Sequence, residues 1–193
     1  MMLCHPGFVL PQGDDWVYER KYDGWRALAL CAPPVITLIT RSGGDYSSRF
    51  PTVVQSLKSL KTPCLLDGEI VAWKEGDTVD DRESYNAIRS NIHKGYVYRY
   101  VAFDVLNING EDTRKFTLER RQKLLGTLIE KSDIVPTWST NIPPDMSRIM
   151  TDGWEGIVAK RLHSKYVSKR SKDRKSTRLN SSHIPLSRMP SSA

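Results

Sequence analysis

The hexapeptide KYDGWR, Lys21–Arg26, lies between two short runs of apolar and β-branched residues, Trp16–Arg20 and Ala27–Cys31. Such runs are typical of β-strands, and Asp23-Gly24 is typical of a tight turn. A third run of the same kind, Val35–Thr40, follows shortly afterwards. We therefore expect two or three antiparallel strands joined by tight turns in this part of the chain.

Lys21 stands where the first strand ends and the turn begins, so its amine would lie at the edge of a cleft. A lysine amine is a nucleophile only when it is unprotonated, a state that neighbouring cations and partial desolvation favour. Arg26, together with a bound metal ion, could supply that environment and neutralise a phosphate. The alternative is a surface hairpin with mixed charges.

Two longer apolar runs, Cys64–Trp73 and Val97–Leu106, are interrupted by acidic residues. Acids inside a buried strand are costly unless they bind a cation or accept hydrogen bonds. In the first run, Glu69 could accept from a ribose hydroxyl or hold Mg²⁺ through water. The alternative is that Asp67 or Glu69 pairs with a structural arginine. In the second run, Phe103 is either a core aromatic or one wall of a base-binding slot.

The segment EGIVAK, Glu155–Lys160, predicts a strand with a carboxylate at its start and a lysine at its end. In a regular strand these two side chains face opposite sides, so they need not share one task. Glu155 could reach a metal ion and Lys160 a phosphate, whereas a plain strand edge is the alternative. Arg41 precedes two flexible glycines, an arrangement that suits phosphate contact.

Helical spacing of apolar residues predicts a short helix from Pro51 and an amphipathic helix over Thr117–Lys131, with Thr117 as its N-cap. Another short helix is expected after Pro143-Pro144, and Lys74–Arg82 is polar and loop-like. Strands that occur in groups, with helices at irregular intervals, indicate the α+β class.

Composition excludes several classes of protein. The chain has 39% hydrophobic residues, 5 Trp and 8 Tyr, which argues against disorder. It contains no apolar run long enough to span a membrane, and Met1–Asp14 lacks the features of a signal peptide. Cys4, Cys31 and Cys64 are scattered, as are the four histidines, which predicts reduced thiols in a cytoplasmic protein and no zinc site.

The formal charge of +7 arises at the C-terminal end. Residues 1–159 hold 19 basic and 21 acidic side chains, whereas the last 34 residues hold the other 10 basic and 1 acidic. In that end, DRKSTRLNSSH (Asp173–His183) and SRMPSSA (Ser187–Ala193) look like the in-frame translation of a sequencing adaptor. We therefore expect residues 173–193 to be disordered read-through, and the charge to be weak evidence for a polyanionic partner.

Taken in order, the motifs Glu19-Arg20-Lys21, KYDGWR, TRSGG, LLDGEIVAW, YVAFDVL and WEGIVAKR resemble the adenylation domain of ATP-dependent DNA ligases of the bacterial end-joining kind. The resemblance extends from about Trp16 to Lys172. It implies a covalent nucleotidyltransferase fold, an α+β domain of antiparallel sheets flanked by helices with ATP between them. Residues 1–172 would then be an adenylation domain that lacks its last strand, with the OB-fold domain absent.

The resemblance implies a role for each matching residue. Lys21 would attack the α-phosphate of ATP, expel pyrophosphate and become lysyl-AMP. Glu19 lies where the family contacts adenine, Phe103 matches the aromatic that stacks on adenine, and Val158 lies near the opposite face of the ring.

Five further positions match residues that contact phosphate, ribose, metal or DNA in that family. Arg26 and Arg41 match contacts to the ribose, the phosphate or nicked DNA, and Lys160 matches a base near the phosphates. Glu69 matches the carboxylate for ribose and metal, and Glu155 matches a second metal-linked carboxylate. Mg²⁺ is implied because attack on a triphosphate requires charge neutralisation.

The implied function of the full-length parent is sealing of nicks in duplex DNA, in DNA repair and recombination, by a monomeric protein. AMP would pass to Lys21, then to the 5′-phosphate at the nick, and the 3′-hydroxyl would displace it. The chain as written is expected to bind ATP weakly and not to ligate. Alternatives are an RNA ligase, an mRNA-capping guanylyltransferase, or a non-catalytic nucleotide- or DNA-binding fragment that still binds after Lys21→Ala.

Overall fold

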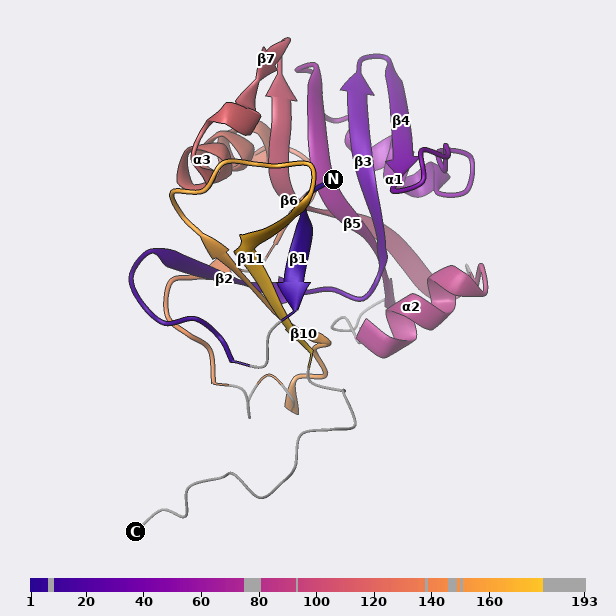
Figure 1. Cartoon of the computed structure of the whole chain (residues 1–193). Helices are drawn as coiled ribbons and strands as arrows, with labels where there is room; N and C mark the ends of the chain where they lie inside the picture. The colour runs from indigo at the N-terminus through magenta and orange to yellow at the C-terminus, as the bar shows by residue number, and fades with distance from the viewer. Residues whose placement is uncertain are drawn as a thin grey trace.

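The computed structural model describes residues 1–6, 9–74, 81–92, 94–137, 139–145, 149 and 151–178. They form two β-sheets with helices beside them, which confirms the predicted α+β class (Figure 1). The first sheet has the strand order β1-β11-β10-β2-β9, formed by Leu3–Pro6, Arg170–Arg178, Gly156–Arg161, Trp16–Lys21 and Ser139–Thr140. The second has the order β4-β3-β5-β6-β7, formed by Val35–Thr40, Trp25–Ala32, Cys64–Lys74, Tyr96–Ile108 and Glu111–Asp112, and β8 (Val135–Pro136) also pairs with β6.

Most neighbouring strands in these sheets are antiparallel, as predicted. Two pairs are parallel, β1 with β11 and β6 with β8. In the described part of the chain, three α-helices accompany the second sheet, and a 3-10 turn, η1, covers Thr113–Lys115. Helix α1 (Pro51–Leu57) packs on β4 and β6, α2 (Asp81–Arg89) on β5, and α3 (Leu118–Ile129) on β6 and β8. None of the helices in the described part of the chain has the length and apolar character needed to cross a membrane.

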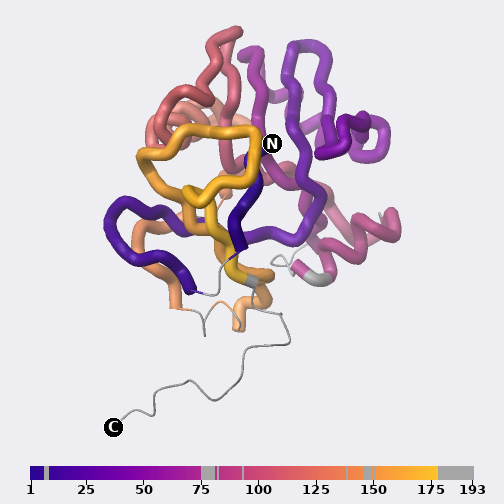
Figure 2. Tube along the Cα trace, in the orientation of Figure 1, coloured from indigo at the N-terminus to yellow at the C-terminus, as the bar shows by residue number. Residues whose placement is uncertain are grey.

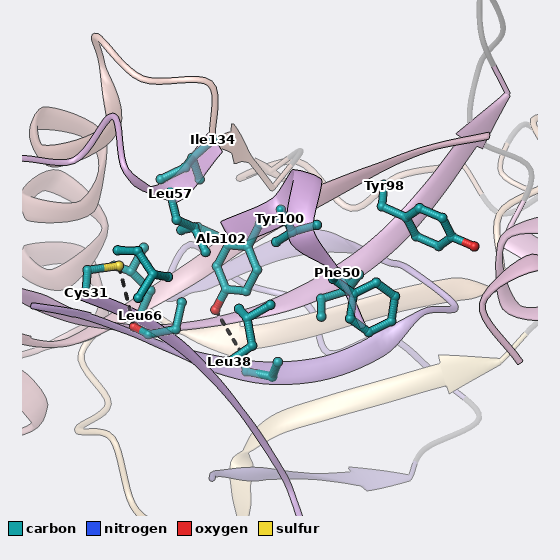
Figure 3. Close-up of a cluster of buried hydrophobic side chains, with 14 of the residues drawn as sticks. Cys31, Leu38, Phe50, Leu57, Leu66, Tyr98, Tyr100, Ala102 and Ile134 are labelled. Carbon is teal, nitrogen blue, oxygen red and sulfur yellow. Dashed lines mark hydrogen bonds between the residues drawn. The ribbon is translucent and has the colours of Figure 1, made fainter. Parts of the chain in front are cut away.

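The largest core lies between the second sheet and its helices. Leu57 of α1 and Ile134 pack there against Tyr100 of β6 and Leu66 of β5 (Figure 3). The Tyr100 hydroxyl is buried but donates a hydrogen bond of 2.8 Å to the carbonyl oxygen of Ala27, so its polar atom is satisfied. The helices thus cover one face of this sheet and leave residues of its other face for the first sheet.

The strands β3 and β4 form the hairpin that the sequence predicts, but the pairing expected for Trp16–Arg20 with Ala27–Cys31 is wrong. Strands β2 and β3 belong to different sheets, and the chain crosses between them at 22–24. Gly24 makes the crossing fit, because a Cβ there would lie 2.2 Å from the carbonyl oxygen of Ile70 on β5. Lys21 therefore ends one sheet directly beside the other.

The helix predicted from Pro51 is confirmed as α1. Thr117 is the N-cap of α3 as expected, since its hydroxyl accepts from the backbone N–H of Arg120 at 3.4 Å. The loop expected over Lys74–Arg82 is wrong at both ends, because Lys74 is the last residue of β5 and Asp81 is the first residue of α2. Most of the helix expected after Pro143-Pro144 lies outside the described residues.

The C-terminal boundary also differs from the prediction. Disorder was expected from Asp173 onward, but Asp173–Arg178 form the second half of β11. β11 lies between β10, to which it is antiparallel, and the N-terminal strand β1, a neighbourhood visible in Figure 2. The physical reason is that a sheet edge offers backbone hydrogen bonds to any extended segment, whatever its side chains. Residues 179–193 lie outside the described residues.

Candidate active site

A cavity of about 740 Å³ lies between the two sheets. Residues of β2 and β10 line it from the first sheet, and residues of β3, β5 and β6 line it from the second. The structure brings seven of the predicted site residues to its wall: Glu19, Lys21, Arg26, Arg41, Glu69, Phe103 and Val158. Glu155 and Lys160, the other two, contact side chains of that wall.

The amine of Lys21 is paired with the carboxylate of Glu155. Lys21 is the last residue of β2, and Glu155 directly precedes β10. Because β2 and β10 are antiparallel with Lys21 opposite Gly156, the two side chains meet although 134 positions separate them. Their side chains are 21% and 13% exposed, so the pair is partly desolvated and still reachable from solvent.

Glu69 lies on β5, opposite Arg26 of β3, and is half-buried at the cavity wall. Burial raises the pKa of Glu69 to about 8, against the opposing influence of the charges of Arg26 and Lys21. The carboxylate oxygens of Glu69 and Glu155 are suitable Mg²⁺ ligands. Within the described ranges no cluster of three or more Asp, Glu, His or Cys side chains could hold a metal by itself. The donor set therefore fits an ion that takes one or two carboxylates and completes its coordination with water and substrate phosphates.

The raised pKa of Glu69 predicts a pH dependence of stability. The folded protein holds the Glu69 proton more tightly than the unfolded chain, so this contribution is complete below the ordinary value of 4.5 and is lost as pH rises through about 8. Thermal unfolding measured from pH 4 to pH 9 without divalent metal should show wild type losing a few degrees relative to Glu69→Gln. Parallel curves for the two proteins would contradict this assignment.

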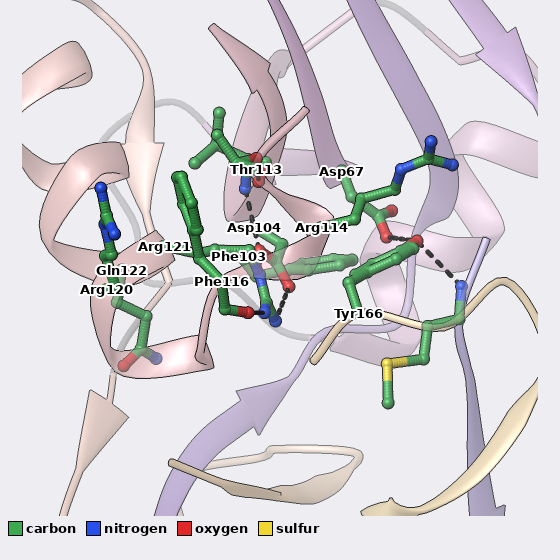
Figure 4. A network of polar contacts seen from close by, with 12 residues as sticks. Asp67, Phe103, Asp104, Thr113, Arg114, Phe116, Arg120, Arg121, Gln122 and Tyr166 are labelled. Atoms are coloured by element: carbon green, nitrogen blue, oxygen red, sulfur yellow. Dashed lines mark hydrogen bonds and ion pairs between the residues drawn. The ribbon is translucent and has the colours of Figure 1, made fainter. Parts of the chain in front are cut away.

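Arg26 is held by Asp67, which is completely buried. Its Nε and Nη2 donate to the two carboxylate oxygens of Asp67 at 3.0 and 2.6 Å. The hydroxyl of Tyr166 also donates to Asp67, at 2.6 Å, and accepts from the backbone N–H of Met2 (Figure 4). Burial alone would raise the pKa of Asp67, but the Arg26 guanidinium holds it below its ordinary range. The expected pairing of an acid with an arginine is therefore confirmed for Asp67, and that arginine is Arg26 of the cavity wall.

Glu19 and Lys160 form a second buried pair, with Glu19 at the cavity wall and Lys160 behind it. Their side chains are 3% and 4% exposed, and Lys160 Nζ lies 2.5 Å from Glu19 Oε2. Gln122 of α3 donates to the other oxygen of Glu19 at 3.1 Å. Burial lowers the pKa of Lys160, the Glu19 charge opposes this, and Arg174 adds to it. Lys160 thus lies beside the predicted adenine contact, and its amine also contacts the carbonyl oxygen of Phe103.

Phe103 on β6 and Val158 on β10 line the cavity from the two facing sheets. The guanidinium of Arg26 lies 5.4 Å from the centre of the Phe103 ring, and that of Arg174 lies 5.0 Å from it. Arg174 is a cavity residue that the sequence analysis missed, because it falls in the segment assigned to read-through. Its Nε is buried and has no hydrogen-bond partner among the described residues.

The comparison with known proteins agrees with this arrangement. The family model for the ATP-dependent DNA ligase domain matches residues 8–175. The chain belongs to the ATP-dependent DNA ligase domain family. This ligase domain is 34% identical over 169 residues to the multifunctional non-homologous end joining protein LigD of Pseudomonas aeruginosa, covering 84% of the chain. It is 32% identical over 165 residues to a probable DNA ligase of Dictyoglomus thermophilum, covering 77% of the chain.

The same fold occurs in a solved structure, the ligase domain of LigD from M. tuberculosis. The TM-score is 0.79 at 26% identity, with 92% of this chain and 58% of that chain covered. The ligase domain described here spans 20% of the Pseudomonas protein and 28% of the Dictyoglomus protein. Family and fold are thus established for this segment, whereas the activity of a whole ligase is a matter of proposal.

Proposed function

We propose that this chain is the adenylation unit of a DNA ligase and that Lys21 carries AMP as a covalent lysyl-AMP. The observation that supports this most strongly is the Lys21–Glu155 pair at the edge of a cavity walled by Glu69, Phe103 and Val158. A nucleophile beside an oriented carboxylate and a pocket of nucleotide size are the two requirements of the step.

In the proposed step the Lys21 nitrogen bonds to the α-phosphorus of ATP, and the bond from that phosphorus to the bridging oxygen breaks. Pyrophosphate leaves with the electron pair. The Lys21 amine, an ammonium in its ion pair, loses one proton before it attacks and a second as the N–P bond forms. Glu155 accepts a hydrogen bond from this amine, so it is the group placed to receive the first proton, and the second passes to solvent. Phe103 and Val158 would flank the base, and Glu19 would contact it. Arg26 and Arg41 would face the ribose, the phosphates or DNA.

We propose that Glu69 and Glu155 hold Mg²⁺ together with the triphosphate. When bound, the ion would neutralise charge on the phosphates and the leaving pyrophosphate. In the parent protein, the AMP would then pass to the 5′-phosphate of a DNA nick. The origin of residues 173–193 in adaptor sequence stays a prediction.

The test is incubation of the chain with ATP or GTP and Mg²⁺, followed by intact-mass measurement, and then addition of nicked DNA or nicked RNA. An AMP adduct that forms slowly with ATP and is not formed with GTP is the expected result. A GMP adduct would favour a capping enzyme, and sealing of nicked RNA alone would favour an RNA ligase. Tight ATP binding without an adduct would favour a non-catalytic binding module.

A further inference from the structure

Asp81 lies outside the cavity but behind its reactive pair. It is the first residue of α2 and is 1% exposed, and neither its position nor the polar run before it marks it as a site residue in the sequence. A carboxylate that is buried so completely is costly unless several groups satisfy it. The groups that contact the Asp81 carboxylate come from the segments that carry Lys21 and Glu155.

Three contacts converge on the Asp81 carboxylate. Its Oδ2 accepts from the backbone N–H of Glu155 at 2.8 Å. The Nη2 of Arg20 lies 3.1 Å from Oδ1. Burial raises the pKa of Asp81, and Arg20 together with the backbone N–H groups of Glu155 and Asp23 acts against this rise. Arg20 and Asp23 flank Lys21 in sequence, and Glu155 is the partner of its amine, so one carboxylate contacts both halves of the pair.

The surroundings of Arg20 reinforce this link. Its guanidinium lies 4.9 Å from the centre of the Tyr22 ring and 5.0 Å from that of Trp154. Tyr22 follows Lys21, and Trp154 precedes Glu155. Asp81 therefore orients an arginine that itself lies against both segments, which adds a side-chain contact to the backbone hydrogen bond from Glu155.

Docking of α2 does not depend on this carboxylate alone. Ser84, also buried, accepts from the backbone N–H of Ala72 at 3.0 Å and connects α2 to β5. Ala87 and Ile88 belong to the largest core cluster. The Ser84 contact thus supplies a matched control, because it fixes the same helix without contacting Lys21, Glu155 or Asp23.

We propose that Asp81 is a positioning residue for the reactive lysine, fixing the backbone at Asp23 and Glu155 so that the Lys21 amine and the Glu155 carboxylate meet at the cavity edge. This inference rests on the proposed function of Lys21. Displacing a reacting group by about 1 Å lowers a rate on the order of 10²-fold, so a residue of this kind acts strongly without contacting the substrate.

The first test is single-turnover transfer of AMP to Lys21 in wild type, Asp81→Asn and Ser84→Ala. Asparagine keeps the volume but loses the charge and one acceptor. The rate at saturating ATP should fall about 10- to 100-fold in Asp81→Asn. The ATP concentration for half-maximal rate should change less than about threefold, because Asp81 does not line the cavity. Ser84→Ala should keep the wild-type rate.

The second test needs no ATP. Lysines are methylated reductively at a temperature where circular dichroism shows each variant folded, and peptide mass spectrometry follows Lys21 and Lys123. Lys123 is an exposed lysine paired with Glu119 on α3. Release of the amine from Glu155 should speed methylation of Lys21 several-fold in Asp81→Asn and leave Lys123 unchanged.

The outcomes of these tests distinguish the positioning role of Asp81 from the proposed function of Lys21. Equal Lys21 methylation in wild type and Asp81→Asn, or equal AMP transfer, would overturn the positioning role. If Lys21 is methylated faster in Asp81→Asn than in wild type, but the wild-type protein never accepts AMP, the proposed function is overturned and the positioning role is supported. An equal loss of AMP transfer in Ser84→Ala would show that helix docking in general, and not Asp81, is responsible.

Discussion

Replacing Lys21 with alanine should reduce transfer of AMP from ATP to the protein to background, a loss on the order of 10³-fold or more. The cause is chemical, because no other amine among the described residues is both at the cavity wall and paired with a carboxylate that can receive its proton. Arginine at this position would keep the charge and the pair with Glu155 but supply no usable nucleophile, so Lys21→Arg should be equally inactive.

The matched control for this prediction is Lys123→Ala. That residue is a lysine in an ion pair, as Lys21 is, but its side chain is 76% exposed and lies on α3 far in sequence from the motif. We expect the Lys123→Ala variant to accept AMP on Lys21 at the wild-type rate. Label retained in Lys21→Ala would contradict the assignment of the nucleophile.

Replacing Asp104 with alanine should cost about 3–5 kcal/mol of the free energy of unfolding, because it leaves the buried Arg121 charge without its partner. Arg121 Nε and Nη2 donate to the two Asp104 oxygens at 2.7 and 3.0 Å, and Nη1 donates to the carbonyl oxygens of Phe116 and Ser164 (Figure 4). The pair holds α3 against β6 next to Phe103. Urea unfolding measures the loss, and thermal unfolding should shift by about 10 °C.

Two comparisons make this prediction specific. Removing both charges in Asp104→Leu/Arg121→Leu should recover much of the lost stability, because no unpaired charge is then buried. Glu119→Ala, which breaks an exposed ion pair on the same helix, should cost less than about 1 kcal/mol. Equal losses in Glu119→Ala and Asp104→Ala would contradict the importance of burial.

The sequence predicts the elements well where a local pattern specifies them. Alternation of apolar residues fixes the β3–β4 hairpin and β10, and the helical spacing with its Thr117 cap fixes α3. It does not predict that β2 and β3 belong to different sheets, because a strand pattern is the same whichever sheet it joins. Gly24 is the residue that permits the crossing, but Asp-Gly is equally typical of a hairpin turn.

The residues of the candidate site also divide into those that a local motif predicts and those whose contacts depend on the tertiary structure. Lys21, Glu69 and Phe103 are predicted from motifs, and the structure brings all three to one cavity. Asp81 could not be predicted, since it lies in a polar run and acts through backbone N–H groups that carry no sequence signal. The pairing of Lys160 with Glu19 also depends on strand register, which the sequence does not specify.

The measurement that tests the central claim most directly is peptide mapping of the wild-type chain after incubation with millimolar ATP and Mg²⁺. The account predicts one AMP per chain, attached through a phosphoramidate bond to the peptide that contains Lys21 and released by pyrophosphate. An AMP on another residue, or no adduct on a folded chain that binds ATP, would contradict it.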